Sequence, residues 1–420
     1  NPTLFNLSAQ ANQVSTSNLN PAIGVNTSLI KRPRSNVKIK KRSLEIFIMF
    51  KQYYIPISIA LASKSLILLL IPILASQINP NYKYTSLWAS WNVWDARHYI
   101  DIAIYNYHRA SNDEAVLIGF LPFLPLTIYI FKSFFHTSAL VAGYIVSGFS
   151  TILLAIIFYK LILLDYGKRI ANMAILMLFI FPTSFFLHIP YTESLFILLS
   201  VSAFFFVRKK YYWISFLCIA LATFTKIAGL ALIPAIFIEI LFFDKEYFKR
   251  LDINNRLAIF ILGSTLSLSG FFVYLFINYY VWGDPFYFNI IKKQFHSISF
   301  APFGQGLIGA LNALSYRVGF EQFMLGYAQI TAFALGLIMS IYTLIKIRLS
   351  YGIFMVIVLW LSYSSSFWSG MPRFILPLFP MFIVLALFSK SSLFKYLWIL
   401  SSTSLLIFFA LIFIQWGPVL

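Results

Sequence analysis

The sequence predicts an all-α polytopic membrane protein, and three observations carry this prediction. Hydrophobic residues make up 60% of the 420 positions and only 11% are charged, whereas about 25% of residues are charged in a typical soluble domain. The mean hydropathy is +0.82. Apolar runs of roughly 17–25 residues recur, each long enough to cross a hydrocarbon core of about 30 Å. Because the runs are continuous rather than alternating, they indicate helices rather than barrel strands.

The charge balance fits the same class. The chain has 32 Lys and Arg against 13 Asp and Glu, a formal net charge of +19. Much of this charge lies in short loops, where basic residues orient helices and face anionic membrane lipids. No basic face suited to a duplex is visible, so we expect no nucleic-acid partner. The single cysteine, Cys218, excludes an internal disulfide.

The first 43 residues differ from the rest. Asn, Ser and Thr dominate up to Ser28, and seven Lys or Arg follow between positions 31 and 42 without an acid. This pattern predicts a disordered arm with a polybasic juxtamembrane segment over 1–43. It also places the start of the first helix in the cytoplasm. A multi-helix transmembrane domain is expected over 44–420.

The apolar runs fall near 53–75, 117–135, 138–164, 170–187, 191–207, 211–226, 228–243, 257–280, 323–345, 351–368, 371–389 and 394–416. The loops between the later runs are basic and are therefore expected on the cytoplasmic side. All of them lie on that side only if one apolar run before residue 165 does not cross the membrane. The best candidate is 117–135, which is short and contains Pro122 and Pro125. We therefore expect about eleven transmembrane helices, with 117–135 at the outer surface or re-entrant.

This topology assigns most of the unusual polar residues to the outer face. That face receives two long outer loops, 76–116 and 282–320, and the turns at 187–193, 226–229 and 368–373. We expect these segments to converge although they are scattered in the sequence. Lys64 lies midway along the first run, at a depth where a charge is costly and usually paired, and the sequence does not indicate its partner.

The first outer loop concentrates groups of catalytic type. Asp95, His98 and Asp101 fall within seven positions, and in a helix the pairs three residues apart share a face. Three interpretations follow from the spacing alone. Asp95 is a general base, or the three residues bind a divalent ion, or the aspartate caps a helix N-terminus.

Other polar residues also allow two interpretations each. Tyr191 and Glu193 follow Pro190 at a helix start, or they bind sugar hydroxyls. Lys226 reaches the membrane interface or pairs with a lipid phosphate. Asp284 belongs to a turn or binds substrate. Arg373 is a surface arginine or recognises a phosphate.

Several short motifs occur in order along the chain. They are Trp94-Asp95-x-x-His98, Pro122-Phe123-Leu124-Pro125, Phe181-Pro182-Thr183-Ser184, Pro190-Tyr191-Thr192-Glu193-Ser194, Gly283-Asp284-Pro285 and Met371-Pro372-Arg373-Phe374. Taken in this order, they resemble the motifs of the glycosylphosphatidylinositol mannosyltransferase II family and its prokaryotic relatives. The chain departs from the family pattern at two places: the family usually has Gly-Tyr where this chain has Asn106-Tyr107, and Arg-Pro where it has Lys226-Ile227.

The resemblance implies a GT-C glycosyltransferase. Such an enzyme moves a sugar, here expected to be mannose, from a polyprenyl or dolichyl phosphate to a hydroxyl of a lipid-linked or envelope glycan, with inversion. It works on the extracytoplasmic or lumenal face of a prokaryotic plasma membrane or the endoplasmic reticulum. The resemblance implies no metal or cofactor beyond the lipid-phosphate sugar, which acts as a co-substrate. A membrane partner subunit is a further expectation, because human-type members use one.

Carried onto this chain, the resemblance makes Asp95 the catalytic base. The remaining candidates bind substrate. Arg373, Lys226 and Arg97 face the leaving phosphate, and His98 orients Asp95 or touches the substrate. The sugar pocket is expected to be shaped by Tyr191 and Glu193, and Asp284 is a further residue expected to bind substrate.

Two other classes remain as alternatives. One is a polytopic transporter or lipid flippase, which would place ionisable residues near the bilayer midplane, whereas the acids here gather at helix ends. The other is a non-catalytic membrane subunit. Its sequence would not be expected to keep both Asp95 and Glu193.

Overall fold

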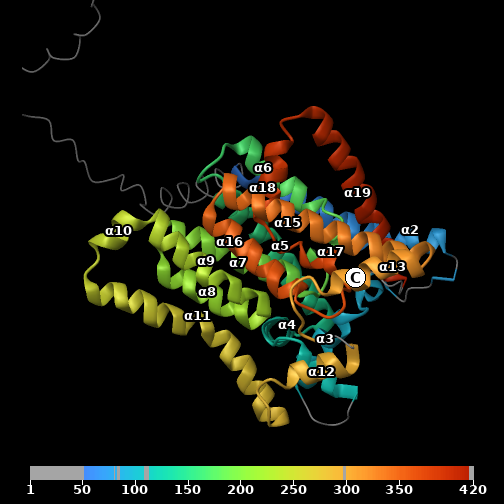
Figure 1. The fold of residues 1–420 in the computed structure, drawn as a ribbon. Helices are drawn as coiled ribbons and strands as arrows, with labels where there is room; N and C mark the ends of the chain where they lie inside the picture. Colours follow the sequence, from blue (N-terminus) through green and yellow to red (C-terminus); the bar gives the residue numbers. More distant parts are fainter. Residues whose placement is uncertain (1–51, 80, 83–85, 108–112, 297–298, 416–420) are drawn as a thin grey trace, which may run out of the picture. The chain divides into compact units, whose positions relative to one another are not determined.

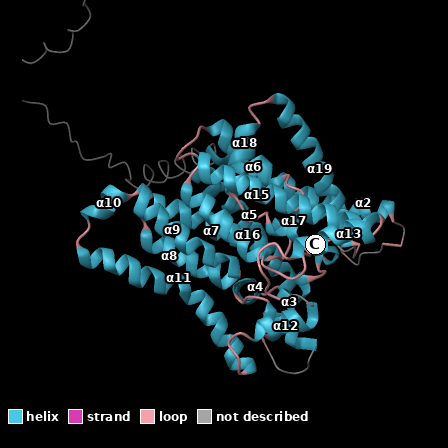
Figure 2. Cartoon of the chain, viewed as in Figure 1, coloured by secondary structure: helices cyan, strands magenta, loops and turns pink. Residues whose placement is uncertain are grey.

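The computed structural model describes residues 52–79, 81–82, 86–107, 113–296 and 299–415. The arm predicted over 1–43 lies outside these residues. The described residues are mainly helical (Figures 1 and 2). Among them, β pairing is limited to an isolated antiparallel bridge between Phe300 and Ser365. The all-α class predicted from the sequence is confirmed.

The helices of the first half begin with a long apolar helix, Gln52–Ile78, whose last part is α2 (Ile71–Ile78). The α-helices that follow are α3 (Asp95–Tyr105), α4 (Phe123–Phe135), α5 (Ala139–Ile162), α6 (Lys168–Phe179), α7 (Thr192–Arg208), α8 (Tyr212–Thr225), α9 (Leu232–Ile238) and α10 (Lys245–Arg250).

The second half continues with the longest described helix, which ends at Gly283 in a left-handed conformation (φ 78°) that glycine adopts without strain. Its α-helices are α11 (Ile253–Trp282), α12 (Tyr287–His296), α13 (Gly306–Tyr316), α14 (Gly319–Gln322), α15 (Ala328–Lys346), α16 (Leu349–Tyr363), α17 (Met371–Phe374), α18 (Pro380–Phe388) and α19 (Ser392–Ile414).

Five helices of the described chain are long and apolar enough to cross a membrane: Gln52–Ile78, Ala139–Ile162, Ile253–Trp282, Gly319–Lys346 and Ser392–Ile414. The protein is therefore a multi-pass integral membrane protein. Helix α4 has 13 residues, so it is about 20 Å long and shorter than the hydrocarbon core. This length fits the expectation that 117–135 does not cross, while the total of eleven spans stays a prediction.

Helix α7 lies among the other helices and is the element on which the core is built. It packs against α5, α8 and α9 (Figure 1). Most of its apolar side chains are buried, and those of Phe196 and Phe204 are 0% exposed. Because its partners surround it, α7 holds whatever its two ends carry in a fixed place.

The chain breaks its helical pattern between α6 and α7. Residues 180–191 form only a short 3₁₀ turn (Ser184–Leu187), and most of the segment is buried. Irregular backbone at membrane depth needs partners for its polar groups inside the protein. Hydroxyl groups of neighbouring helices supply them: Thr151 donates to the carbonyl of Leu187 at 2.7 Å, and Ser63 donates at 3.0 Å to that of Phe179, the last residue of α6.

His188 lies at the centre of the remaining hydrogen bonds, and its carbonyl is the partner of Lys64. The ammonium of Lys64 donates to the His188 carbonyl at 3.2 Å, and Ser147 donates to the same oxygen at 3.1 Å. The His188 ring lies 2.8 Å from the Ser63 hydroxyl through Nε2. The charge midway along the first helix therefore supports broken backbone rather than pairing with an acid.

A second polar network ties the far end of α7 to its neighbours. Arg208 binds both carboxylate oxygens of Asp165, at 2.5 and 2.6 Å. Arg348, just before α16, holds the buried carboxylate of Glu239 through bonds of 2.6 to 3.0 Å, and Ser350 donates to it at 2.5 Å. These residues lie in or beside loops that the charge pattern assigns to the cytoplasmic face.

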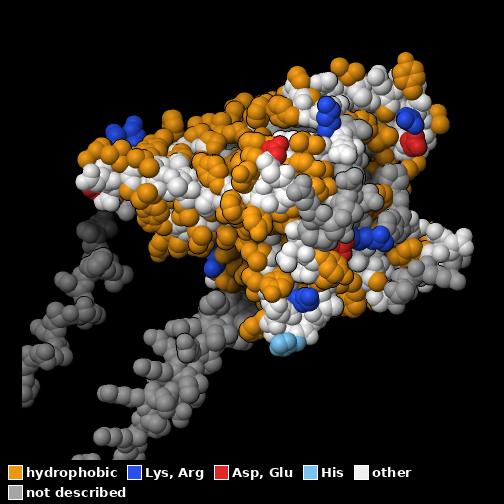
Figure 3. Space-filling model, turned by 90° about the horizontal axis from the view of Figure 1, so that it is seen from below, with side chains coloured by type: hydrophobic (Ala, Val, Ile, Leu, Met, Phe, Trp, Pro, Cys, Tyr) orange, Lys and Arg blue, Asp and Glu red, His pale blue; other side chains and the backbone are white. Residues whose placement is uncertain are grey.

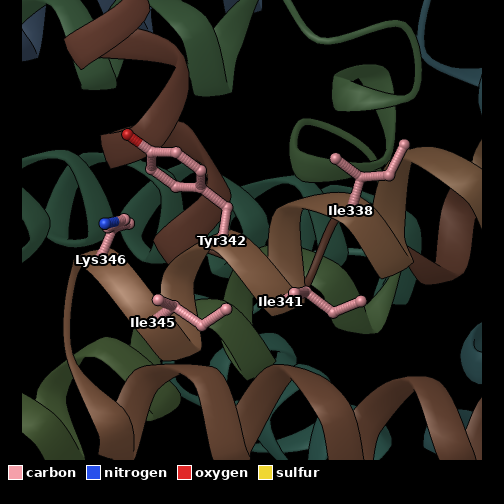
Figure 4. A pocket seen from close by; sticks show the side chains of 5 residues that line it. All are labelled: Ile338, Ile341, Tyr342, Ile345 and Lys346. Carbon is pink, nitrogen blue, oxygen red and sulfur yellow. The ribbon is translucent and has the colours of Figure 1, made fainter.

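The surface has the character expected of a lipid-embedded protein. Hydrophobic side chains cover most of the described face in Figure 3, and charged side chains are scattered. An apolar depression of about 300 Å³ runs along α15, where it is lined by Ile338, Ile341, Tyr342, Ile345 and Lys346 (Figure 4). Ile338 and Ile345 are 62% and 67% exposed, so this depression is a feature of a surface that faces lipid.

Candidate active site

Helix α3 presents Asp95 at its first residue. The residue before it, Trp94, is the N-cap; it has a positive φ of 53°, and its side chain does not accept a hydrogen bond from the helix. Non-glycine residues rarely adopt such a conformation, and it is found more often at functional sites. Asp95 therefore does not act as the helix cap. Its carboxylate is free for a contact outside the helix.

The other end of α3 contains a departure from the family pattern. Asn106 closes the helix with φ 60° and ψ −168°. Glycine, which the family usually has here, adopts this backbone conformation without steric cost, whereas a residue with a Cβ is strained in it. The asparagine therefore keeps the backbone turn at a cost in strain.

Arg373 joins two acids that lie far away in the sequence. Its Nη1 donates to Oδ2 of Asp95 at 2.6 Å, and its Nε donates to Oε1 of Glu193 at 2.6 Å. The arginine belongs to the short helix α17, which begins after Gly370 in a left-handed conformation (φ 80°) with Pro372 in the first turn. A turn predicted in one outer segment thus meets the first outer loop.

Glu193 also holds the lysine of the turn after α8. The ammonium of Lys226 lies 2.7 Å from Oε1 of Glu193, the oxygen that Arg373 also uses. The turn is tight because Gly229 lies against the backbone of Ala222, where a Cβ would come within 2.6 Å of the carbonyl carbon. Burial lowers the pKa of Lys226 below its usual value, and the carboxylate of Glu193 offsets this only in part.

We refer to Asp95, Glu193, Lys226 and Arg373 as the charged cluster. Two carboxylates and two cations balance in number, and their side chains differ in exposure. Glu193 is 0% exposed, Arg373 9%, Lys226 16% and Asp95 34%. The cluster is therefore anchored at Glu193 and opens at Asp95.

Aromatic rings support the arginine from several sides. The guanidinium carbon of Arg373 lies 4.6 Å from the ring centre of Tyr191 and 4.9 Å from that of Phe186. Tyr99, one turn after Asp95, meets Tyr191 edge to face at 6.2 Å. These contacts fix the plane of the guanidinium through cation–π attraction.

Three aromatic residues of this site were not predicted from the sequence. They are Tyr99, Phe186 and Phe374, the last of which lies 5.8 Å from the Lys226 ammonium. Tyr99 could have been found, because it follows Asp95 by four positions on the same helix face. Phe186 and Phe374 give no such signal in a chain with 46 phenylalanines.

Of the eight predicted site residues, Asp95, Tyr191, Glu193, Lys226 and Arg373 come together. For the other three the structure gives different partners. Arg97 is exposed and donates through Nε to the Asn92 carbonyl at 3.1 Å, and the His98 ring lies tilted against the Phe120 ring with 4.9 Å between the ring centres. Asp284 accepts from the Phe286 amide at 2.8 Å, which is the turn interpretation. Within the described residues, no three His, Cys, Asp or Glu side chains lie close enough to share a metal ion.

Comparison with known proteins identifies the family. A profile of the mannosyltransferase (PIG-V) family matches residues 36–297, more than half of the chain. Arg373 lies beyond this match, yet the structure places it against Asp95 inside it. The curated proteins searched contain no match.

Among solved structures, the crystal structure of the oligosaccharyltransferase from Archaeoglobus fulgidus, tethered to an acceptor peptide, is similar at 12% identity and a TM-score of 0.42. The similarity covers 88% of this chain but only 56% of that protein, so this chain spans little more than half of its length. The profile confirms the family resemblance expected from the sequence: the chain belongs to the mannosyltransferase (PIG-V) family.

Proposed function

We propose that the protein transfers a sugar, expected to be mannose, from a polyprenyl or dolichyl phosphate to a hydroxyl of a lipid-linked or envelope glycan. One observation carries the proposal. The charged cluster places a partly exposed carboxylate, Asp95, directly beside a buried cation, Arg373, at 2.6 Å. A base next to a phosphate-binding cation is what transfer from a sugar phosphate to a hydroxyl requires.

The reaction uses the two sides of the cluster differently. The acceptor oxygen attacks the anomeric carbon while Asp95 takes the hydroxyl proton, and a new glycosidic bond forms with inversion. The bond between the anomeric carbon and the phosphate oxygen breaks, and the electron pair leaves with the polyprenyl phosphate. Arg373 and Lys226 stabilise the growing negative charge on that leaving group.

The site is proposed to face the extracytoplasmic or lumenal side. The basic loops support this orientation. The network of Asp165, Arg208, Glu239 and Arg348 lies at the end of α7 that carries the basic loops, whereas Glu193 lies at the opposite end. The family implies a lipid-linked donor and a glycan acceptor within the membrane.

Replacing Asp95 tests the proposal. Membranes containing Asp95→Asn are incubated with radiolabelled polyprenyl-phosphate mannose and candidate glycolipid acceptors, and transfer is measured. Loss of a well-placed base should lower the rate by about 10²–10⁴. The matched control is Glu321→Gln, which removes the charge of a carboxylate that pairs with Arg317 at 3.0 Å on the exposed surface.

Two results would contradict the proposal. Near-normal transfer by a correctly folded Asp95→Asn protein would remove Asp95 from the chemistry. Label that crosses the membrane while still attached to its polyprenyl carrier, without reaching any acceptor, would instead identify a flippase.

A further inference from the structure

Arg373 has one fixed contact and one exposed contact. Its Nε bond leads to Glu193, which is 0% exposed and also binds Lys226. Its Nη1 bond leads to Asp95, which is 34% exposed at the side chain. A ligand that enters from the open side therefore meets the Asp95 contact first.

Arg373 also has a further hydrogen-bond donor, Nη2, on the same guanidinium. Within the described part of the chain, its hydrogen bonds use Nε and Nη1, so Nη2 is available. The carboxylate of Asp95 holds the guanidinium through a single bond, from Nη1 to Oδ2. A phosphate group can engage Nη1 and Nη2 together in the fork geometry that arginine favours.

The aromatic rings around the guanidinium of Arg373 allow it to exchange one hydrogen-bond partner for another while it stays in place. Phe186 and Tyr191 hold its faces, and Glu193 holds its Nε edge. The cation can thus pass from a carboxylate to a phosphate while its plane and its anchor stay in place. What moves is Asp95, which lies at the strained N-terminus of α3 after Trp94 (φ 53°).

We propose that the donor phosphate displaces Asp95 from Arg373, so that donor binding itself releases the base for the acceptor hydroxyl. This inference rests on the proposed function. In the free enzyme Asp95 occupies the phosphate position and its Oδ2 is engaged. When the donor arrives, its phosphate takes the Nη1–Nη2 edge and the freed carboxylate turns to the acceptor. No bond to carbon changes in this step, and no proton moves until the acceptor is present.

The exchange makes the donor the first substrate and protects the site from unproductive chemistry. An acceptor that enters before the donor finds the base already paired. As the bond to the sugar breaks, the phosphate gains charge and holds Arg373 more strongly. Asp95 therefore does not recapture the arginine until the polyprenyl phosphate has left.

Equilibrium binding of polyprenyl phosphate to the purified full-length protein tests the exchange. If Asp95 competes for Arg373, Asp95→Asn should tighten binding by about threefold to fivefold, because a solvent-screened charge-assisted hydrogen bond no longer has to be broken. Glu321→Gln removes the same charge from an exposed ion pair and should bind like the unmodified protein. A gain in Asp95→Asn that disappears when Arg373→Ala is added assigns the competition to this arginine.

The outcomes are separable. Unchanged or weaker binding by a folded Asp95→Asn protein overturns the exchange while leaving the proposed function in place. A gain that persists in the Arg373→Ala background also overturns it, because a general charge effect then explains the result. If the unmodified protein binds no polyprenyl phosphate and transfers no sugar, the proposed function fails and the exchange fails with it.

Discussion

Glu193 is expected to stabilise the charged cluster, whereas Asp95 is the proposed catalytic base. The carboxylate of Glu193 is 0% exposed and binds two cations, at 2.6 and 2.7 Å. Removing one partner of a buried ion pair costs about 3–5 kcal/mol, because the other charges stay buried without compensation. Glu193→Gln leaves both Arg373 and Lys226 facing a neutral amide, so its cost should lie in this range.

Asp95→Asn makes the same chemical change at the exposed end of the cluster. Its carboxylate makes one contact with Arg373 and is 34% exposed, so solvent screens the loss and the cost should be about 1 kcal/mol or less. The difference between the two variants is thus about 2–4 kcal/mol. Unfolding of the detergent-solubilised proteins by a denaturing detergent, followed by circular dichroism, measures it. Equal destabilisation by the two substitutions would refute Glu193 as the anchor.

Three further predictions concern single residues. The pKa of Lys226 lies below the usual lysine value of 10.5, so raising the pH through that lowered value removes the charge of Lys226. The KM for the donor, obtained from initial rates, should therefore rise on the alkaline side, and Lys226→Arg should shift this rise to higher pH. Asn106→Gly should stabilise the protein by about 1 kcal/mol because the backbone there has positive φ, whereas Asn106→Ala should not, as thermal unfolding will show. Lys64→Met removes one of two hydrogen-bond donors to the His188 carbonyl and should lower the free energy of unfolding by about 1 kcal/mol. Lys64→Gln keeps a donor and should lower it less in the same assay.

The sequence predicted the fold class and most of the cluster for physical reasons. Continuous apolar runs leave few alternatives to a helical membrane protein. Polar residues are rare in such a chain, so Asp95, Glu193 and Arg373 stood out. Their convergence followed from placing the outer segments on one face of the membrane, which the basic loops indicate.

The sequence could not predict which side chains form ion pairs and hydrogen bonds with one another. Glu193 was expected to bind sugar, and its burial between Lys226 and Arg373 depends on how α7, α8 and α17 meet. The partner of Lys64 is a backbone carbonyl, and no side-chain pattern encodes such a contact. The same holds for Phe186, one apolar residue among many until packing places it under the guanidinium.

Helix α7 carries an ion pair at each end, and this limits how the enzyme can open. Glu193 in its first turn and Arg208 in its last are 15 residues apart, or about 22 Å along the axis. Because ion pairs hold both ends, we expect α7 to behave as a rigid element that resists hinge bending. Entry and exit of the proposed lipid-linked substrate must then rely on rearrangement elsewhere, and the charged cluster should keep its shape throughout the proposed reaction.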